Sequence, residues 1–216
     1  SRYASTRLPG KPLREINGKP MLQHVYERGT ESAATDVIIA TDDERIAEAA
    51  EKFGARVCMT GDQHQSGTER IAEVCDLMDW GDERVVVNLQ GDEPTMPAAL
   101  INQCAGLLED GAADIATLAS PLASLQDFDN PNVVKVIVDD DHNAIYFSRA
   151  AIPFARKETD RAAACDLALH HHGIYAYRCG VLRRFVAAAP STVALKVTTR
   201  SRPSGATWKS ANEPTS

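Results

Sequence analysis

The stretch Val-Val-Val-Asn-Leu-Gln-Gly-Asp-Glu-Pro, at residues 85–94, decides the fold class of this chain. It joins a β-branched apolar run to a short polar turn that contains glycine. A run that is apolar throughout, rather than alternating, is typical of a parallel strand buried on both faces. Such sheets bind ligands at the carboxyl ends of their strands. The stretch therefore predicts a buried strand at residues 85–89, followed by a polar segment at a ligand-binding edge.

Strands and helices are predicted to alternate around this stretch. Asp42 or Asp43 is the expected cap of a helix that Gly54 ends. This alternation predicts an α/β sandwich with a mostly parallel sheet. The other elements expected in this half are strands at residues 37–40 and 56–58 and helices at residues 68–78 and 97–108.

The ends of three predicted strands carry polar residues. These are Asp42, the loop after Cys58, and residues 90–92. Because the carboxyl ends of parallel strands meet at one edge of a sheet, we expect the three segments to converge there.

The second half of the chain is predicted to be richer in strands. A polar turn at residues 139–143 favours a hairpin. The polar stretch at residues 156–166 is interpreted as a flap or an intersubunit arm. The expected elements are strands at residues 115–118, 133–138, 144–147 and 173–177 and a helix at residues 181–189.

The composition changes near residue 190. From Ser191 onward ten of 26 residues are Ser or Thr, four are basic, and only Glu213 is acidic. Sustained apolar periodicity also disappears, which is typical of a segment without a packed core. We therefore predict one domain over residues 1–190 and a tail, disordered or frameshifted, over residues 191–216.

Composition also limits the function. The chain has 216 residues, 44 % of them apolar, and a formal net charge of −7. General nucleic-acid binders carry a basic face, so no nucleic-acid partner is expected. No apolar run approaches transmembrane length and no signal peptide is visible, so we expect no membrane insertion.

Five scattered cysteines without a C-x-x-C pair favour free thiols in a reducing compartment, and hence a cytoplasmic protein.

The N-terminal loop has the composition of a phosphate-binding segment. Arg2, Arg7 and Lys11 surround small hydroxyl residues and a Pro-Gly turn. Guanidinium and ammonium groups neutralise phosphate oxygens, and Gly10 lets the backbone approach them. The alternative is a solvated basic N-terminus, since basic clusters are commonly surface charge. The loop does not match the G-x-x-x-x-G-K-[ST] pattern of a P-loop.

Two polar segments are candidates for metal and base binding. The carboxylate of Asp92, in its glycine turn, suits Mg²⁺, a hard cation that prefers oxygen ligands and bridges phosphates. Its alternative role is that of a surface turn residue or helix cap. Residues 64–70 could hydrogen-bond a nucleobase, and their alternative is an N-cap made by Ser66 or Thr68.

Two further segments are candidates for substrate binding. His170-His171-His172 suggests a metal site, but successive strand residues point to opposite faces, so at most two share a side. No neighbouring ligand completes a zinc set, and a sugar-contacting His with Tyr175 is the preferred interpretation. Arg149, after an apolar strand, could bind a substrate carboxylate bidentately or form a surface ion pair.

Five segments in order resemble the 3-deoxy-manno-octulosonate (Kdo) cytidylyltransferase family. No one of them is specific alone, but their order from residue 2 to about residue 190 is. They are YASTRLPGKP at residues 3–12, HQSGTER at 64–70, NLQGDEP at 88–94, YFSRA at 146–150 and HHGIYAYR at 171–178.

The resemblance implies a Rossmann-like nucleotidyltransferase of the glycosyltransferase-A type, with a mixed, mostly parallel sheet and a smaller β-rich subregion. It implies coupling of CTP to Kdo, with Mg²⁺, to give CMP-Kdo and diphosphate for lipopolysaccharide biosynthesis. It also implies a homodimer, for which residues 152–166 are a plausible arm. By similarity, Arg7 and Lys11 hold the triphosphate with Arg2 nearby, Ser66, Gly67 and Thr68 line the cytidine pocket, Asp92 binds Mg²⁺, and Gln90, Arg149, His171 and Tyr175 face the sugar.

The sequence departs from the family pattern at both ends. The apolar strand that precedes the Arg2 loop in the family is not found, which would expose ladder groups of its neighbours. After Ser191 nothing matches the family's helix, strand and Val-Asp-Thr-Pro type segment, whose Asp is the second Mg²⁺ ligand. We interpret the change as a shifted reading frame and predict weak or no activity for this polypeptide.

Two other functions are also compatible with the sequence. One is a cytidylyltransferase for a different acid sugar, such as a neuraminate. The other is a non-catalytic nucleotide-binding remnant, which the departures at both ends favour.

Overall fold

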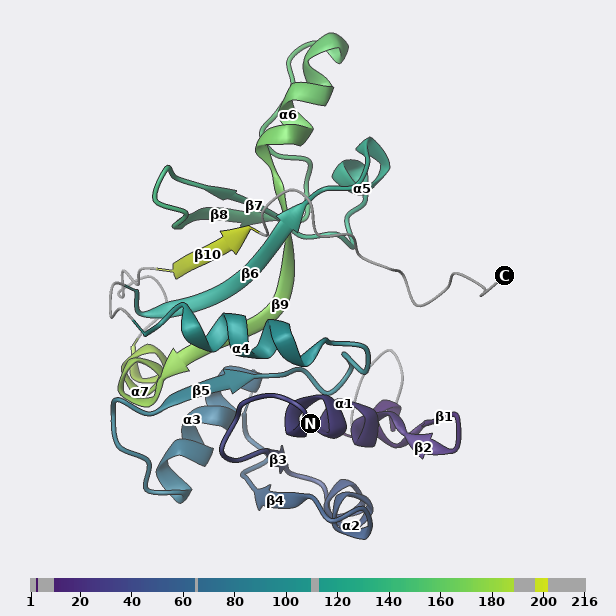
Figure 1. Cartoon of the computed structure of the whole chain (residues 1–216), viewed down its shortest axis with the longest axis vertical. Helices are drawn as coiled ribbons and strands as arrows, with labels where there is room; N and C mark the ends of the chain where they lie inside the picture. The colour runs from purple at the N-terminus through teal and green to yellow at the C-terminus, as the bar shows by residue number, and fades with distance from the viewer. Residues whose placement is uncertain (1–2, 4–9, 65, 110–112, 189–196, 202–216) are drawn as a thin grey trace. The chain divides into compact units, whose positions relative to one another are not determined.

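The structure is a computed structural model that describes residues 3, 10–64, 66–109, 113–188 and 197–201 (Figure 1). The chain divides into two compact units. The first contains residues 1–118 and 173–198, and the second contains residues 119–172 and 199–216. The three boundaries between the units fall within strands β6 (Ile115–Pro121), β9 (Leu169–Arg178) and β10 (Val197–Ser201).

The first unit alternates strands and helices, as the sequence predicts. Asp43 caps α2 by accepting from the Arg45 N–H, and Gly54 follows the end of that helix with a φ of 79°. The elements are β1 (Glu15–Ile16), β2 (Lys19–Pro20), α1 (Met21–Thr30), β3 (Ile38–Thr41), α2 (Glu44–Lys52), β4 (Arg56–Met59), α3 (Gly67–Leu77), β5 (Val85–Asn88), α4 (Ala98–Gly106) and α7 (Cys179–Ala187), with a 3₁₀ turn at Lys11–Leu13.

The strands of the first unit belong to separate sheets. β3 and β4 pair in parallel, with Ile38 opposite Arg56. β5 pairs antiparallel with β9, with Val85 opposite Arg178. Among the described strands, β3 pairs only with β4 and β5 pairs only with β9. The expected α/β class with a mixed sheet is confirmed. The predicted parallel pairing is found for β3 and β4, whereas β5, predicted as a parallel strand buried on both faces, pairs antiparallel with β9 and is only partly buried.

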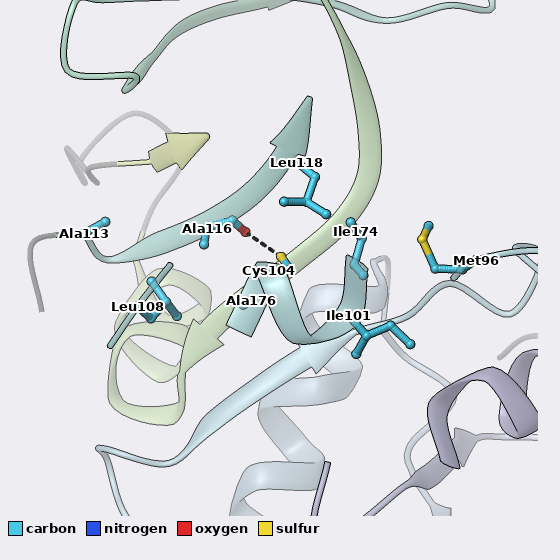
Figure 2. Packing of buried hydrophobic residues seen from close by; sticks show 9 residues of the cluster. All are labelled: Met96, Ile101, Cys104, Leu108, Ala113, Ala116, Leu118, Ile174 and Ala176. Atoms are coloured by element: carbon cyan, nitrogen blue, oxygen red, sulfur yellow. Dashed lines mark hydrogen bonds between the residues drawn. The ribbon is translucent and has the colours of Figure 1, made fainter. Parts of the chain in front are cut away.

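The largest core cluster of the first unit lies under α4 (Figure 2). Ile101, Cys104 and Leu108 follow one another at helical spacing and are nearly inaccessible to solvent. Ile174 and Ala176 alternate along β9 and so point to the same face. The other members of the cluster are Met96, Ala113, Ala116 and Leu118.

The second unit is built on an antiparallel hairpin. β7 (Lys135–Val138) pairs with β8 (Ala144–Ser148), and its start pairs with β9 through Lys135 and His170. The Asp139 N–H donates to the Asn143 carbonyl at 2.9 Å, and His142 adopts a left-handed φ of 62°. The predicted polar turn at residues 139–143 is therefore confirmed. Helices α5 (Leu125–Asp129) and α6 (Arg161–Leu167) complete the described part of this unit.

Two predicted regions differ in detail from the structure. The polar stretch at residues 156–166 contains a 3₁₀ turn at Glu158–Asp160 and most of α6, because Ala164 and Cys165 are buried against Phe128. Residues 197–201 form the strand β10 (Val197–Ser201), inside the segment predicted to be a tail. The rest of that segment, residues 191–196 and 202–216, lies outside the described residues, and the boundary at residue 190 stays a prediction.

A buried arginine fixes the carboxyl end of the β3–β4 pair. Arg70 of α3 has 3 % of its side chain exposed and donates from Nη2 to Asp42 Oδ2 at 2.7 Å. Its Nη1 donates to the Thr60 hydroxyl and, at 3.3 Å, to the Gly61 carbonyl. Asp42 follows β3 and the loop from Thr60 follows β4. Two of the three predicted polar segments thus meet through one guanidinium.

Arg70→Met is expected to destabilise the protein strongly. The substitution removes the counter-charge of a largely buried carboxylate, which costs about 3–5 kcal/mol. Arg28→Met is the matched control, because Arg28 pairs with Glu31 on the surface with 37 % and 48 % of the two side chains exposed, and such pairs contribute about 0–1 kcal/mol. Urea unfolding measures both. Equal losses in the two variants would contradict the role assigned to Arg70.

Candidate functional site

One large cavity lies within the first unit. Its volume is about 920 Å³. The predicted site residues Lys11, Gly67 and Thr68 line it, together with the turn at residues 90–92. Tyr175 also lines it, whereas most of the remaining wall is apolar. A concave apolar pocket with a few convergent polar groups is the usual form of a small-molecule site.

Lys11 and Asp92 meet at this cavity although 81 positions separate them. Lys11 Nζ lies 2.8 Å from Asp92 Oδ2, with 38 % and 44 % of the two side chains exposed. Gly10, with a left-handed φ of 68°, turns the chain into the 3₁₀ turn that carries Lys11. The structure therefore brings the predicted phosphate cation and the predicted metal carboxylate together. Arg2 and Arg7 lie outside the described residues.

Glu93 is a neighbouring carboxylate that the sequence analysis did not single out. Burial, and then the adjacent Asp92 charge, raise the pKa of its carboxyl group. Two adjacent carboxyl groups thus differ in environment, because Asp92 is paired and exposed whereas Glu93 is desolvated. The signal for Glu93 in the sequence is only its position between Asp92 and Pro94.

The start of α3 faces the cavity. Ser66 caps this helix by accepting from the Glu69 N–H at 3.2 Å, so its hydroxyl has the capping role that was the alternative interpretation. Gly67 leaves the wall open, since the nearest atom to a Cβ placed there is Asn88 Nδ2 at 3.8 Å. Thr68 hydrogen-bonds to Tyr177, which opposes the effect of burial on the pKa of that phenol.

Gln90 and Tyr175 are both positioned by β9: Tyr175 belongs to this strand, and Gln90 hydrogen-bonds to it. Gln90 Nε2 donates to the Gly173 carbonyl at 2.8 Å. Tyr175 lies opposite Asn88 in the β5–β9 ladder, and its ring stacks on Tyr177 with centroids 6.0 Å apart. Burial raises the pKa of the Tyr175 phenol. These two predicted sugar-facing residues are therefore both placed at residues 173–175 of β9.

Arg149 belongs to the second unit and is fixed by backbone contacts. Its Nη1 donates to the Pro131 carbonyl at 3.0 Å. Lys135, wholly buried, donates to the carbonyls of Arg149, Asn130 and Val133 at 2.7–2.9 Å. Burial lowers the pKa of Lys135. Lys135 thus fixes the backbone at Arg149, a contact that sequence reasoning missed because a lysine at the start of a strand is ordinarily a surface residue.

The three histidines of β9 divide between two faces, as predicted. The rings of His170 and His172 lie 4.7 Å apart, whereas His171 packs edge-on against Phe147 at 4.8 Å. Burial, and then the other histidines, lower the pKa of His171 to about 4, and His172 is lowered to about 4 in the same way. Both rings are therefore neutral at neutral pH.

The described residues contain no group of three or more His, Cys, Asp or Glu side chains that could hold a metal ion. Three carboxylates line the cavity, those of Asp36, Asp92 and Glu109. Asp92 is the one that contacts Lys11. One carboxylate suits Mg²⁺, which commonly binds one or two carboxylates together with phosphate oxygens and water, but not an all-protein zinc set.

All five cysteines are free and buried, as expected for thiols that act as small apolar residues. None of the described helices is both long and apolar enough to cross a bilayer.

The fold and the site together define a class of protein. An α/β unit that places a carboxylate after strand β5, against the Lys11 cation and at a cavity, has the form of an α/β protein that binds a small ligand at the carboxyl ends of its strands. The comparisons then give the family: the model described as Cytidylyltransferase matches residues 1–201. The chain belongs to this family, among the 3-deoxy-manno-octulosonate cytidylyltransferases.

Curated relatives carry that name. The Haemophilus ducreyi protein is 49 % identical over 89 % of this chain and 78 % of its own length. The Pseudoalteromonas atlantica protein is 51 % identical over 88 % of this chain and 77 % of its own length.

Solved structures agree. One described as CMP:2-keto-3-deoxy-manno-octonic acid synthetase complexed with CTP superposes with a TM-score of 0.83 at 37 % identity, covering 94 % of this chain and 87 % of that chain. A cytidylyltransferase from Leptospira borgpetersenii shares the fold at 16 % identity, with a TM-score of 0.54 over 87 % of this chain and 61 % of its own.

Acid is expected to destabilise the protein through the β9 histidines. Their folded pKa of about 4 lies below the ordinary 6.5, so the unfolded chain takes up protons first as the pH falls. The stability that they contribute is complete above pH 6.5 and declines between pH 6.5 and about pH 4. Urea unfolding across this range is expected to show the decline, and the double variant His171→Asn, His172→Asn to reduce its slope. An unchanged slope would contradict the assignment. His24→Asn, at a partly exposed histidine of α1 outside β9, is the control.

Proposed function

We propose that this protein transfers CMP from CTP to Kdo and releases diphosphate. The observation that carries the proposal is the Lys11–Asp92 pair at the polar end of the cavity, in a chain about half identical to proteins of that name. The CTP complex of the related structure supports the nucleotide.

At phosphorus the reaction makes one bond and breaks one. The anomeric hydroxyl oxygen of the sugar attacks the α-phosphorus and its proton passes to solvent, the bond from that phosphorus to the bridging oxygen breaks, and diphosphate leaves with the electron pair. Such a transfer depends on alignment and on neutralising charge more than on covalent help from the protein.

Each cluster of the first unit has a role in this proposal. Lys11 binds the triphosphate, and Arg2 and Arg7 are expected to add charge to the same loop. The open wall at Gly67 receives the cytidine, beside Ser66 and Thr68. Gln90 and Tyr175 face the sugar. Arg149 and His171 belong to the second unit, and their roles toward the sugar carboxylate and hydroxyls stay predictions from the sequence.

Mg²⁺ is part of the proposal, with Asp92 as its protein ligand. When bound, it would neutralise charge on the phosphates and lower the pKa of oxygens that it contacts. Lys11 now occupies an oxygen of this carboxylate, so nucleotide binding would draw the ammonium group toward phosphate and free that oxygen.

The proposal extends to the setting of the reaction. Five free, buried thiols are consistent with a reducing compartment, which supports a cytoplasmic location. The product CMP-Kdo would serve lipopolysaccharide assembly. A cytidylyltransferase for a neuraminate and a non-catalytic nucleotide-binding remnant are the alternatives.

Asp92→Asn and Lys11→Met are each expected to lower the rate of diphosphate release from CTP and Kdo by about 10²–10³-fold, since each removes a charge that faces the phosphates. Lys19→Met is the matched control. Lys19 forms a similar exposed pair, 2.7 Å from Glu27, outside the cavity.

Three further measurements separate the alternatives. Neuraminate in place of Kdo tests the sugar, and turnover with neuraminate alone would refute Kdo activation. Saturable CTP binding without turnover would favour the remnant. Wild-type rates in both cavity variants would refute the proposed site.

A homodimer is also part of the proposal. Phe154 has 87 % of its surface exposed and Leu167 has 67 %, and Ile145 and Tyr146 of β8 are exposed in the same unit. Apolar side chains exposed in this number commonly mark a protein interface.

Phe154→Asp is expected to shift the protein from dimer to monomer in sedimentation experiments, because it places a charge in the contact. Exposed Leu77→Asp, on α3 of the first unit, is the control. A monomeric wild-type protein would refute the dimer, and an unchanged mass for Phe154→Asp would refute this surface.

A further inference from the structure

Two of the five cysteines meet sulfur to sulfur in the core of the first unit. Cys179, the first residue of α7, places its Sγ 3.0 Å from the Sγ of Cys75 in α3. Both side chains are inaccessible to solvent. Because a disulfide bond is about 2.05 Å long, the two sulfurs need to approach by only about 1 Å to become bonded.

The other three cysteines contact the backbone instead. The sulfurs of Cys58, Cys104 and Cys165 lie 3.7–3.9 Å from carbonyl oxygens, those of Met59, Ala116 and Ser124 respectively. The contact between Cys75 and Cys179 therefore differs in kind from the contacts of the remaining thiols.

The backbones that carry the two sulfurs are held against each other. Helices α3 and α7 pack together, and Arg183 of α7 donates to the Cys75 carbonyl at 3.2 Å and to Asp76 Oδ1 at 2.7 Å. The Cys179 N–H donates to the Arg84 carbonyl at 2.9 Å. Two thiols on backbones that are already fixed meet at a high effective concentration, which favours a bond between them.

Burial limits when such a bond can form. Burial, and then the contact with Cys179, raise the pKa of the Cys75 thiol. The thiolate is the nucleophile in disulfide exchange, so Cys75 is unreactive while the core is closed. An oxidant therefore reaches the pair only during a local opening between α3 and α7.

We propose that Cys75 and Cys179 form a reversible disulfide, linking α3 to α7, when the protein is exposed to a small disulfide oxidant such as oxidised glutathione. In the opened state the thiolate of one cysteine attacks the oxidant, a mixed disulfide forms, and one small thiol is released. The thiolate of the other cysteine then attacks the protein sulfur of the mixed disulfide, the intramolecular bond forms, and the second small thiol leaves. Two electrons pass from the cysteines to the oxidant, and the two thiol protons end on the released thiols.

The bond is expected to stabilise the fold. It joins residues 104 positions apart, and a cross-link over so long a loop restricts the unfolded chain strongly. The melting temperature of the oxidised protein is expected to exceed that of the reduced protein by about 5–10 °C. This modification is independent of nucleotide transfer, so it can be tested without CTP or sugar.

The test uses the full chain, first reduced, then freed of reductant and equilibrated with oxidised glutathione under native conditions. After the remaining thiols are blocked by alkylation, trypsin is expected to release residues 71–84 joined to residues 179–183, because each of these peptides is bounded by arginines and contains one cysteine. Dithiothreitol is expected to separate the two peptides. Absence of the joined peptide, bonds chiefly between other cysteines, or glutathione retained on either cysteine would overturn the proposal.

Cysteine variants locate the effect on stability. Cys75→Ala and Cys179→Ala are each expected to abolish both the joined peptide and the rise in melting temperature. Cys104→Ala is the matched control, because Cys104 is equally buried in the first unit but contacts a carbonyl, and this variant is expected to keep both. Equal losses in the control would contradict the assignment. The wild-type chain tests the proposal even where a variant does not fold, since equal melting temperatures of its oxidised and reduced forms would overturn the link between the helices.

Discussion

The buried guanidinium of Arg70 is the interaction on which the polar end of the first unit depends. A cation there is stable only because Asp42, the Thr60 hydroxyl and the Gly61 carbonyl all accept from it. These acceptors follow β3 and β4, while Arg70 itself belongs to α3. One side chain therefore sets the position of a helix start against two strand ends, and the cavity wall at Gly67 follows from it.

The sequence was sufficient for the elements whose causes are local. The β-branched run at residues 85–89, the cap at Asp43 and the turn at residues 139–143 each contain their own signal, and each element is found. The direction of pairing of β5 is not a local property, and the predicted parallel neighbour is an antiparallel one, β9. Chemistry led us to expect Lys11 and Asp92 at one ligand, since a phosphate cation and a metal carboxylate serve a single nucleotide, but not their direct contact.

The roles of residues that depend on distant partners could not be predicted from the sequence. Lys135 is buried because three carbonyls surround its ammonium group, and none of them is marked by a motif. Ser66 differs, because the sequence does mark it as a residue with a role. A hydroxyl at the start of a helix can cap the helix or contact a ligand, and the sequence pattern is the same for both roles. In the structure Ser66 caps α3.

The charged pair also bears on how a nucleotide would enter. Lys11 and Asp92 satisfy each other in the absence of ligand, and their partial exposure keeps that contact weak. In the complex that we propose, a triphosphate with Mg²⁺ would offer each a stronger partner, phosphate for the ammonium group and the metal for the carboxylate. The contact seen here therefore holds the two groups at the cavity mouth at little cost, and its exchange for ligand contacts would leave neither charge unpaired.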